Sequence, residues 1–285
     1  MLLKEHAPAK INLTLRVLGR RLDGYHDLES LVAFAAIGDD LSLLPGETLS
    51  LEVGGPMADG ITAGDDNLVL KAAQAFRVRF PRARVGRFNL IKRLPVASGI
   101  GGGSSDAAAT LRLLARTNEI PANHPRLFEI AASLGADVPV CLLGRACMMR
   151  GIGDEIVDLP APLKLFAVLV NPGVPLETQV VFRELGLAIG QRFGNPIGGA
   201  PSISRGPEEL AEGVNDLEKP AIQLLPVIGD VLALLEKQQS CHLARMSGSG
   251  ATCFGIYEDC RTAAAAAKSI SADHPDWWVV PTLIS

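Results

Sequence analysis

A glycine- and serine-rich stretch at residues 94–107 carries the clearest chemical signal in the sequence. It reads L-P-V-A-S-G-I-G-G-G-S-S-D-A. Glycines let backbone amides approach an anion closely and adopt positive φ. If a helix begins here, its first N–H groups and positive dipole end favour a bound anion. The hydroxyls of Ser104 and Ser105 could reach a phosphate oxygen or Mg²⁺. We therefore predict a phosphate-binding loop.

Three familiar nucleotide-binding loops do not fit this stretch. It lacks the Gly-Lys-Ser/Thr ending of a Walker A loop. No acidic residue ends a second strand about 20 residues later, as a Rossmann dinucleotide site requires. No H-R-D or D-F-G of a protein kinase follows. A flexible linker is the remaining alternative, but linkers rarely separate a patterned strand from a patterned helix.

Polar residues elsewhere occur in patterns suited to catalysis or binding. Asp137 lies in the apolar run G-A-D-V-P-V-C-L-L, where a carboxylate needs a partner or a function. Lys10 and Asn12 project to one side of an alternating segment. Tyr25 and His26 directly follow an Asp-Gly turn. Two alternatives stay open: Asp137 as a helix or turn cap, and Lys10 as an ordinary solvated residue.

Hydrophobic periodicity predicts the elements that position these residues. Strict alternation over residues 10–17 predicts a strand with one buried face. Residues 65–67 supply an N-cap for a helix over 68–80. A strand at 85–94 leads into the loop, and Ser105 or Asp106 caps the next helix. Further strands are predicted at residues 28–37, 41–44, 49–53, 138–143, 146–150, 165–170 and 277–283, and further helices at 125–135 and 262–270. This mix is α+β, with antiparallel strands.

Composition restricts the class of protein. A chain of 285 residues with 48% hydrophobic and 20% charged residues is globular, with one large or two modest domains. A net charge of -4 argues against non-specific nucleic-acid binding. The five cysteines form no C-x-x-C pair, which predicts reduced thiols in a cytoplasmic protein. We expect neither a signal peptide nor a membrane-spanning helix.

Three segments, in this order, resemble the motifs of the galactokinase, homoserine kinase, mevalonate kinase and phosphomevalonate kinase superfamily. They are P-A-K-I-N-L-T-L at residues 8–15, the glycine-rich loop, and M-S-G-S-G-A-T-C-F at 246–254. Other segments resemble the branch whose acceptor alcohol carries a cytidine diphosphate group: G-R-R-L-D-G-Y-H at 19–26, D-D-N-L at 65–68, G-A-D-V-P-V at 135–140 and N-D-L-E at 215–218. Within the superfamily, the R-x-D-G-Y-H run is the most discriminating of these.

The resemblance implies a fold and an activity. The fold would be a two-domain α+β kinase, with an N-terminal domain like domain 2 of ribosomal protein S5, a ferredoxin-like C-terminal domain and the active site in the cleft between them. We expect residues 1–160 to bind ATP and residues 161–285 to contribute to substrate binding. The implied reaction is ATP-dependent phosphorylation of the acceptor's 2-hydroxyl in the methylerythritol phosphate route to isoprenoids, with ATP and Mg²⁺ as cofactors. The expected partner is this small molecule, not nucleic acid or a membrane, and the assembly a monomer or homodimer.

The resemblance also implies roles for individual residues. Asp137 would be the base that takes the hydroxyl proton, paired with Lys10, which stabilises negative charge near the attacking oxygen. The residues implied to bind ATP are Asn67, Pro95, Val96, Ala97, Ser98, Gly99, Ile100, Gly101, Gly102, Gly103, Ser104 and Ser105. The residues implied to bind substrate are Asn12, Tyr25, His26, Thr178 and Phe182. Tyr25 and Phe182 would stack on the cytosine and His26 would hydrogen-bond it. The metal ligands stay unknown.

Some positions depart from the family pattern or allow another interpretation. Ala97 and Ser98 stand where glycines are usual, Ile100 where Leu is usual, and Asp106 where Asn is frequent. Residues 186–207 match no pattern. Core packing competes with a ligand role for Phe182, and helix capping does so for Asn67 and Thr178. The turn at 248–250 is implied to pack against the site, although a simple β-turn would explain it.

Two other functions remain as alternatives. A kinase of the same superfamily acting on homoserine or mevalonate-type alcohols is disfavoured by the R-L-D-G-Y-H run. A nucleotide-binding regulator without catalysis is disfavoured by the presence of both Lys10 and Asp137.

Overall fold

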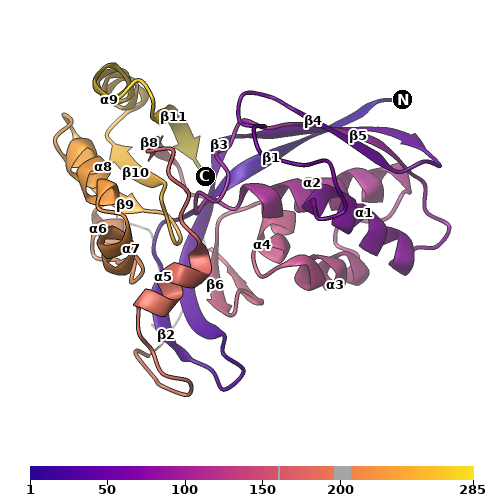
Figure 1. Ribbon diagram of the computed structural model, residues 1–285, viewed down its shortest axis with the longest axis horizontal. Helices are drawn as coiled ribbons and strands as arrows, with labels where there is room; N and C mark the ends of the chain where they lie inside the picture. Colours follow the sequence, from indigo (N-terminus) through magenta and orange to yellow (C-terminus); the bar gives the residue numbers. More distant parts are fainter. Residues whose placement is uncertain (160, 196–206) are drawn as a thin grey trace. The chain divides into compact units, whose positions relative to one another are not determined.

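The computed structural model describes residues 1–159, 161–195 and 207–285. These residues divide into two compact units (Figure 1). Unit 1 consists of Met1–Ala9, Ile37–Val96 and Gly101–Gly144, and unit 2 of Lys10–Ala36, Ala97–Ile100 and Arg145–Ser285. Strands β1 (Leu3–Asn12) and β3 (His26–Gly46) therefore contribute residues to both units. The predicted domain boundary near Pro160 falls on a residue outside the described ranges, as does much of the unmatched segment 186–207.

Unit 1 is a sheet with helices α1 to α4 on one face (Figure 1). Besides its parts of β1 and β3, it contains β4 (Ser50–Gly54), α1 (Leu68–Arg79), β5 (Val85–Ile91), α2 (Gly102–Thr117), α3 (Pro125–Leu134) and α4 (Val138–Leu143). Strand β4 pairs in parallel with β5, and β5 pairs antiparallel with Asp40–Gly46 of β3. The predicted start of α1 is confirmed, since Asn67 is its N-cap. Phe76 of α1 and Phe88 of β5 are buried in the core, which stabilises the helix layer on the sheet.

Two local predictions in unit 1 were wrong. Residues 138–143 form helix α4 instead of a strand, because a short apolar run fits either element. Pro139 in the first turn and Gly144, a left-handed C-cap with φ +66, favour the helix. The N-cap of α2 is Gly101 instead of Ser105 or Asp106.

Unit 2 contains an antiparallel sheet in the order β11-β8-β10-β9. Helix α8 packs on β9 and β10, and α9 packs on β8 and β11. The elements of this unit, besides its parts of β1 and β3, are β2 (Arg16–Arg20), β6 (Cys147–Gly151), β7 (Glu155–Asp158), β8 (Leu165–Asn171), α5 (Thr178–Glu184), α6 (Pro207–Ala211), α7 (Glu218–Leu224), α8 (Val227–Glu236), β9 (Cys241–Met246), β10 (Cys253–Tyr257), α9 (Cys260–Asp273) and β11 (Trp278–Ile284). Within the described ranges, no helix combines the length and apolar character needed to cross a bilayer.

The strand predicted over residues 10–17 differs in the structure. Strand β1 ends at Asn12, and β2 begins at Arg16. Lys10 is 3% exposed, Asn12 1% and Ile11 0%, so the prediction of a single buried face was wrong. The polar face is buried as well at Lys10 and Asn12, where the Asn12 side-chain amide donates to Ser30 Oγ at 2.7 Å.

Candidate active site

The glycine-rich loop runs into the N-terminus of α2. Its N-cap, Gly101, has φ +64, a left-handed conformation that glycine adopts without steric cost. The amide of Ser105 is the first one bonded in the helix, to the Gly101 carbonyl at 2.9 Å. The preceding amides, of Gly102, Gly103 and Ser104, therefore form the open end of the helix. Such an end presents N–H donors and positive dipole charge, which suits a phosphate group.

The structure separates the two serines of the loop. Ser105 is 1% exposed, and its hydroxyl donates to the Pro8 carbonyl at 2.7 Å. Ser104 is half-buried, and no described residue engages its hydroxyl. Ser104 is therefore better placed than Ser105 to offer a hydroxyl to a phosphate oxygen.

Asn67 lies at the start of α1, next to the end of the loop. A Cβ placed on Gly103 would lie 3.3 Å from Leu68 Cδ1, so the first turns of α1 and α2 are adjacent. Both polar groups of the Asn67 side chain are engaged. Its Oδ1 accepts from Val69 N at 3.0 Å, and its Nδ2 donates to the Thr62 carbonyl at 3.0 Å. The structure thus brings Asn67 close to the loop in a helix-capping role.

The middle of the loop, Ala97–Ile100, belongs to unit 2 and packs there on the glycine turn that follows β9. Ser247 Oγ donates to the Gly99 carbonyl at 3.2 Å. A Cβ on Gly99 would lie 2.5 Å from the Ser247 carbonyl oxygen, and one on Gly248 would lie 2.7 Å from the Gly99 carbonyl oxygen. Only glycines permit this backbone contact, so the turn packs against the loop as the resemblance implied.

The N-D-L-E segment holds that glycine turn in place. Asn215 Nδ2 donates to the carbonyls of Met246 and Gly248, at 2.7 and 2.8 Å. Glu218 Oε2 accepts from Met246 N at 2.8 Å. Burial raises the pKa of the Glu218 carboxyl, while the hydrogen bond from the Met246 amide and the charge of Arg245 act to lower it. These contacts give the segment a structural role behind the loop.

Asn12 presents an unsatisfied acceptor. Its backbone N–H donates to Ser247 Oγ at 3.1 Å, and its Nδ2 donates to Ser30. Its Oδ1 is buried and has no hydrogen-bond partner among the described residues. A Cβ on Gly248 would lie 3.2 Å from this oxygen, so it faces the glycine turn. A buried acceptor without a partner is costly, and a donor from a ligand would satisfy it.

Lys10 and Asp137, the predicted catalytic residues, belong to different units. Lys10 of unit 2 is 3% exposed, so it is not a solvated strand lysine, and its amide donates to the Ile100 carbonyl at 2.9 Å. Asp137 of unit 1 is half-buried and precedes α4. Its side chain makes no capping hydrogen bond, so the capping alternative finds no support.

The aromatic residues predicted to bind the nucleobase lie in unit 2. The rings of His26 and Phe182 stack, with centroids 4.6 Å apart and planes at 27°. Burial lowers the pKa of His26, with a smaller contribution from the charge of Arg20. Tyr25 is 60% exposed. Thr178 lies one helical turn before Phe182 in α5, and its hydroxyl is 2.8 Å from Ser249 Oγ of the glycine turn. Unit 2 thus connects the ring pair to the turn through one short helix.

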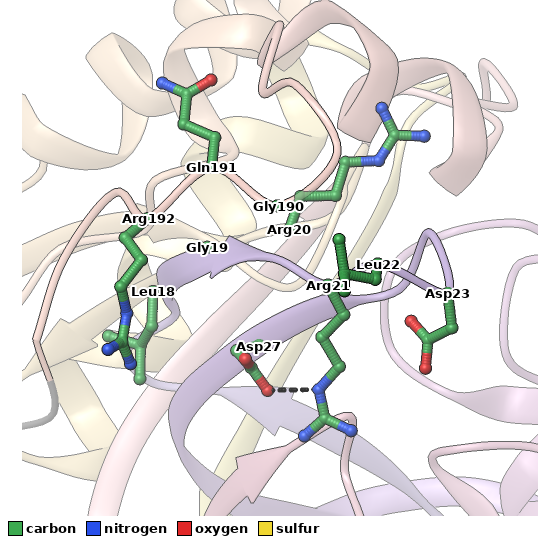
Figure 2. Close-up of a pocket in the computed structure, with 10 residues that line it drawn as sticks. All are labelled: Leu18, Gly19, Arg20, Arg21, Leu22, Asp23, Asp27, Gly190, Gln191 and Arg192. Carbon is green, nitrogen blue, oxygen red and sulfur yellow. Dashed lines mark hydrogen bonds and ion pairs between the residues drawn. The ribbon is translucent and has the colours of Figure 1, made fainter.

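A cavity of ≈ 480 Å³ lies beside the Tyr25 turn (Figure 2). It is lined by Leu18, Gly19, Arg20, Arg21, Leu22, Asp23, Asp27, Gly190, Gln191 and Arg192. Arg21 points toward Asp27 and donates to it at 2.6 Å, so this charge is already neutralised (Figure 2). None of the lining residues was predicted to bind ATP or substrate, and we do not assign the cavity to the active site.

Comparison with known sequences decides the family. The family described as "GHMP kinases N terminal domain" matches residues 67–145, and "GHMP kinases C terminal" matches residues 202–276. The 4-diphosphocytidyl-2-C-methyl-D-erythritol kinase of Methylobacterium radiotolerans is 55% identical over 288 residues, covering 99% of both chains. The protein of that name from Xanthobacter autotrophicus is 54% identical over 290 residues, also covering 99% of both. This chain belongs to the 4-diphosphocytidyl-2-C-methyl-D-erythritol kinase family.

Solved structures agree with this family and with the predicted fold class. A crystal structure of 4-(cytidine 5'-diphospho)-2C-methyl-D-erythritol kinase matches with a TM-score of 0.76 at 34% identity, covering 99% of this chain and 100% of the other. A homoserine kinase from Cytophaga hutchinsonii matches with a TM-score of 0.75 at 16% identity, covering 100% of this chain and 94% of the other. The second likeness shows only that the fold is shared.

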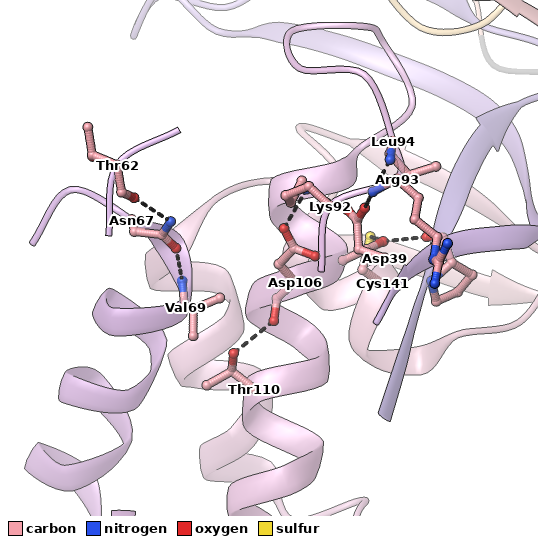
Figure 3. A network of polar contacts seen from close by, with 12 residues as sticks. Asp39, Thr62, Asn67, Val69, Lys92, Arg93, Leu94, Asp106, Thr110 and Cys141 are labelled. Atoms are coloured by element: carbon pink, nitrogen blue, oxygen red, sulfur yellow. Dashed lines mark hydrogen bonds and ion pairs between the residues drawn. The ribbon is translucent and has the colours of Figure 1, made fainter. Parts of the chain in front are cut away.

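Sequence reasoning missed a buried charged cluster next to the glycine-rich loop (Figure 3). Asp39, Lys92 and Asp106 are 0%, 4% and 4% exposed, and Lys92 Nζ donates to both carboxylates. No short motif joins them, because they come from β3, from the residue after β5 and from α2. The available signal was three charges in strongly apolar surroundings, where charges need partners.

Proposed function

We propose that this chain transfers the γ-phosphoryl group of ATP to the 2-hydroxyl of 4-diphosphocytidyl-2-C-methyl-D-erythritol, giving the 2-phosphate and ADP. The observation that carries the proposal is 55% identity, over 99% of both chains, with a kinase of that name. The glycine-rich loop, which opens into the free amides of α2, supports the ATP part of the reaction.

The proposed chemistry needs positioning and charge neutralisation more than covalent help. The acceptor oxygen attacks the γ-phosphorus, and the bond between that phosphorus and the β,γ-bridging oxygen breaks as ADP leaves. Asp137 takes the hydroxyl proton, and its half-buried position directly before α4 supports this role. Lys10 offsets the charge on the transferring group. Its burial supports this, since a desolvated cation interacts more strongly than a hydrated one.

Substrate recognition is proposed for residues of unit 2. Tyr25 and Phe182 would stack on the cytosine, and the unpartnered Nε2 of His26 would hydrogen-bond to it. The low pKa of His26 supports a neutral imidazole, which can offer one donor and one acceptor. Asn12 Oδ1 would accept a hydrogen bond from the acceptor alcohol, and Thr178 would contact the substrate next to the glycine turn.

Mg²⁺ is proposed to enter with ATP as part of the substrate. Such ions keep several waters and use phosphate oxygens with one or two carboxylates, so the fit does not require a dedicated cluster of protein ligands. We also propose that residues 1–160 form the ATP-binding domain and that residues 161–285 contribute to substrate binding, and we propose a cytoplasmic location. The assembly as a monomer or homodimer stays a prediction.

A coupled assay of ADP release tests the function. The purified protein would be given ATP and Mg²⁺ with the cytidine diphosphate substrate, homoserine or mevalonate in turn. Release of ADP with the first alone, with ³¹P resonances of a new phosphomonoester, is the expected result. Release with homoserine or mevalonate, and none with the cytidine substrate, would contradict the proposal.

A further inference from the structure

The buried cluster of Asp39, Lys92 and Asp106 lies wholly in unit 1 and has no part in the chemistry above. The Lys92 ammonium donates to Asp39 Oδ2 and, at 2.7 Å, to Asp106 Oδ2 (Figure 3). Burial acts to lower the pKa of Lys92, but the charges and hydrogen bonds of Asp106 and Asp39 outweigh it, so that this pKa is raised. The ammonium therefore stays charged and donates to both aspartates.

Asp39 also holds the start of the loop. Its second oxygen, Oδ1, accepts from the backbone amides of Arg93 and Leu94, at 2.6 and 2.9 Å. These two residues join the end of β5 to the glycine-rich stretch. Because a carboxylate that accepts several hydrogen bonds is fixed in orientation, β3 dictates where the loop begins.

Asp106 holds the end of the loop. It lies in the early part of α2, directly after the glycines and serines. The ammonium that it binds is close to the open end of that helix, since a Cβ on Gly102 would lie 3.6 Å from Lys92 Nζ. One ion cluster thus joins the start of the loop to α2, the helix whose first amides are proposed to bind the phosphates.

We propose that Asp39 is a positioning residue for ATP, which acts through Lys92 and the amides of Arg93 and Leu94 to hold both ends of the glycine-rich loop in a phosphate-binding geometry. The proposal rests on the ATP part of the proposed function. A buried ion cluster has few alternative arrangements, because each would leave a charge or an amide unpaired. Fixing donors in advance lowers the cost of ordering them around a ligand.

The decisive variant is Asp39→Asn. An asparagine of the same shape can offer one carbonyl oxygen, but its NH₂ group must face either the two amides or the ammonium, all of which are donors. We expect the KM for ATP to rise about tenfold or more, while the KM for the acceptor alcohol changes less than about twofold. A loss of folding alone would instead reduce the active fraction and leave both KM values unchanged.

Glu5→Gln is the matched control. Glu5 of β1 is also an ion-paired carboxylate of unit 1. Its partner Arg112 lies in α2, as Asp106 does, and donates to it at 2.9 Å, away from the loop. The KM of the Glu5→Gln protein for ATP should stay within about twofold of wild type. An Asp39→Asn protein with near-wild-type thermal unfolding and an unchanged KM for ATP overturns the proposal.

A second variant decides the matter if Asp39→Asn does not fold. Asp106→Leu removes the bond between the cluster and α2, while Lys92 stays the counter-ion of Asp39 and Asp39 keeps its contacts with the loop amides. Titration with the ATP analogue adenylyl imidodiphosphate and Mg²⁺ should show binding weakened about fivefold or more, and equal affinity overturns the proposal. Because this readout needs no acceptor, it separates the loop proposal from failure of the kinase reaction.

Discussion

The imidazole of His26 and the ring of Phe182 lie face to face, with centroids 4.6 Å apart. His26 begins β3, and Phe182 lies in α5, so a stack joins two elements far apart in the sequence. Phe182 is only partly buried and also touches the hydrophobic core of unit 2. Phe182 therefore has two kinds of contact, one with the core and one with His26, which is itself proposed to bind the substrate.

Phe182→Leu should separate these two roles. We expect the KM for the cytidine substrate to rise about five- to tenfold, since a stacking ring contributes roughly 0.5–1.5 kcal/mol beyond its buried area, with the KM for ATP unchanged. Phe166→Leu in β8 is the control, because Phe166 also packs at the edge of this core. If both variants lose thermal stability alike and neither alters the KM, Phe182 only packs.

Asp137→Ala should reduce kcat by about 10²–10⁴-fold, the usual contribution of a general base. Binding of the cytidine substrate, measured by calorimetry, should stay close to wild type. Asp158→Ala provides a control for loss of one carboxylate, since Asp158 is an exposed partner of Arg145. Normal turnover by a folded Asp137→Ala protein would remove Asp137 from the mechanism.

The sequence predicted the elements that local signals determine. Asn67 as the cap of α1 was predictable, because a capping residue acts on the helix that directly follows it. Helix α4 was not, since its short apolar run has no periodicity of its own. Ala97, noted where glycine is usual, indeed has φ +49.

Some parts of the candidate site could likewise be predicted from the sequence, and others could not. The loop and the three motifs could be found from residue types and order. The Asp39, Lys92 and Asp106 cluster could not, because its members meet only through tertiary packing. The burial of Lys10 and the unpartnered Asn12 oxygen likewise depend on what covers β1, which the alternating pattern does not specify.

Gly99→Ala should damage both stability and nucleotide binding. The residue has φ +75, and its new Cβ would lie 2.5 Å from the Ser247 carbonyl oxygen, so backbone must move. We expect a loss of about 2–4 kcal/mol in unfolding free energy from strain and overpacking, and a raised KM for ATP. Gly173→Ala is the control, because Gly173 has φ +77 with nothing within 4 Å of the added Cβ. It should cost only about 1 kcal/mol; equal costs would show that the contact with Ser247 is unimportant.

Asp106→Asn should change the pH dependence of stability. Burial, together with the charge of Asp39 and against that of Lys92, raises the pKa of Asp106 from 3.8 to about 7. Between these values the folded chain binds more protons than the unfolded chain, so the unfolding free energy falls as pH rises, and the penalty is complete above the folded pKa. Asparagine does not titrate. The unfolding free energy of the Asp106→Asn protein, relative to that of wild type, should therefore increase by about 1–3 kcal/mol between about pH 5 and pH 8 when measured by urea unfolding. Asp158→Asn, at an exposed carboxylate, should show no such trend, and a pH-independent difference for Asp106→Asn would mean that Asp106 keeps its charge throughout.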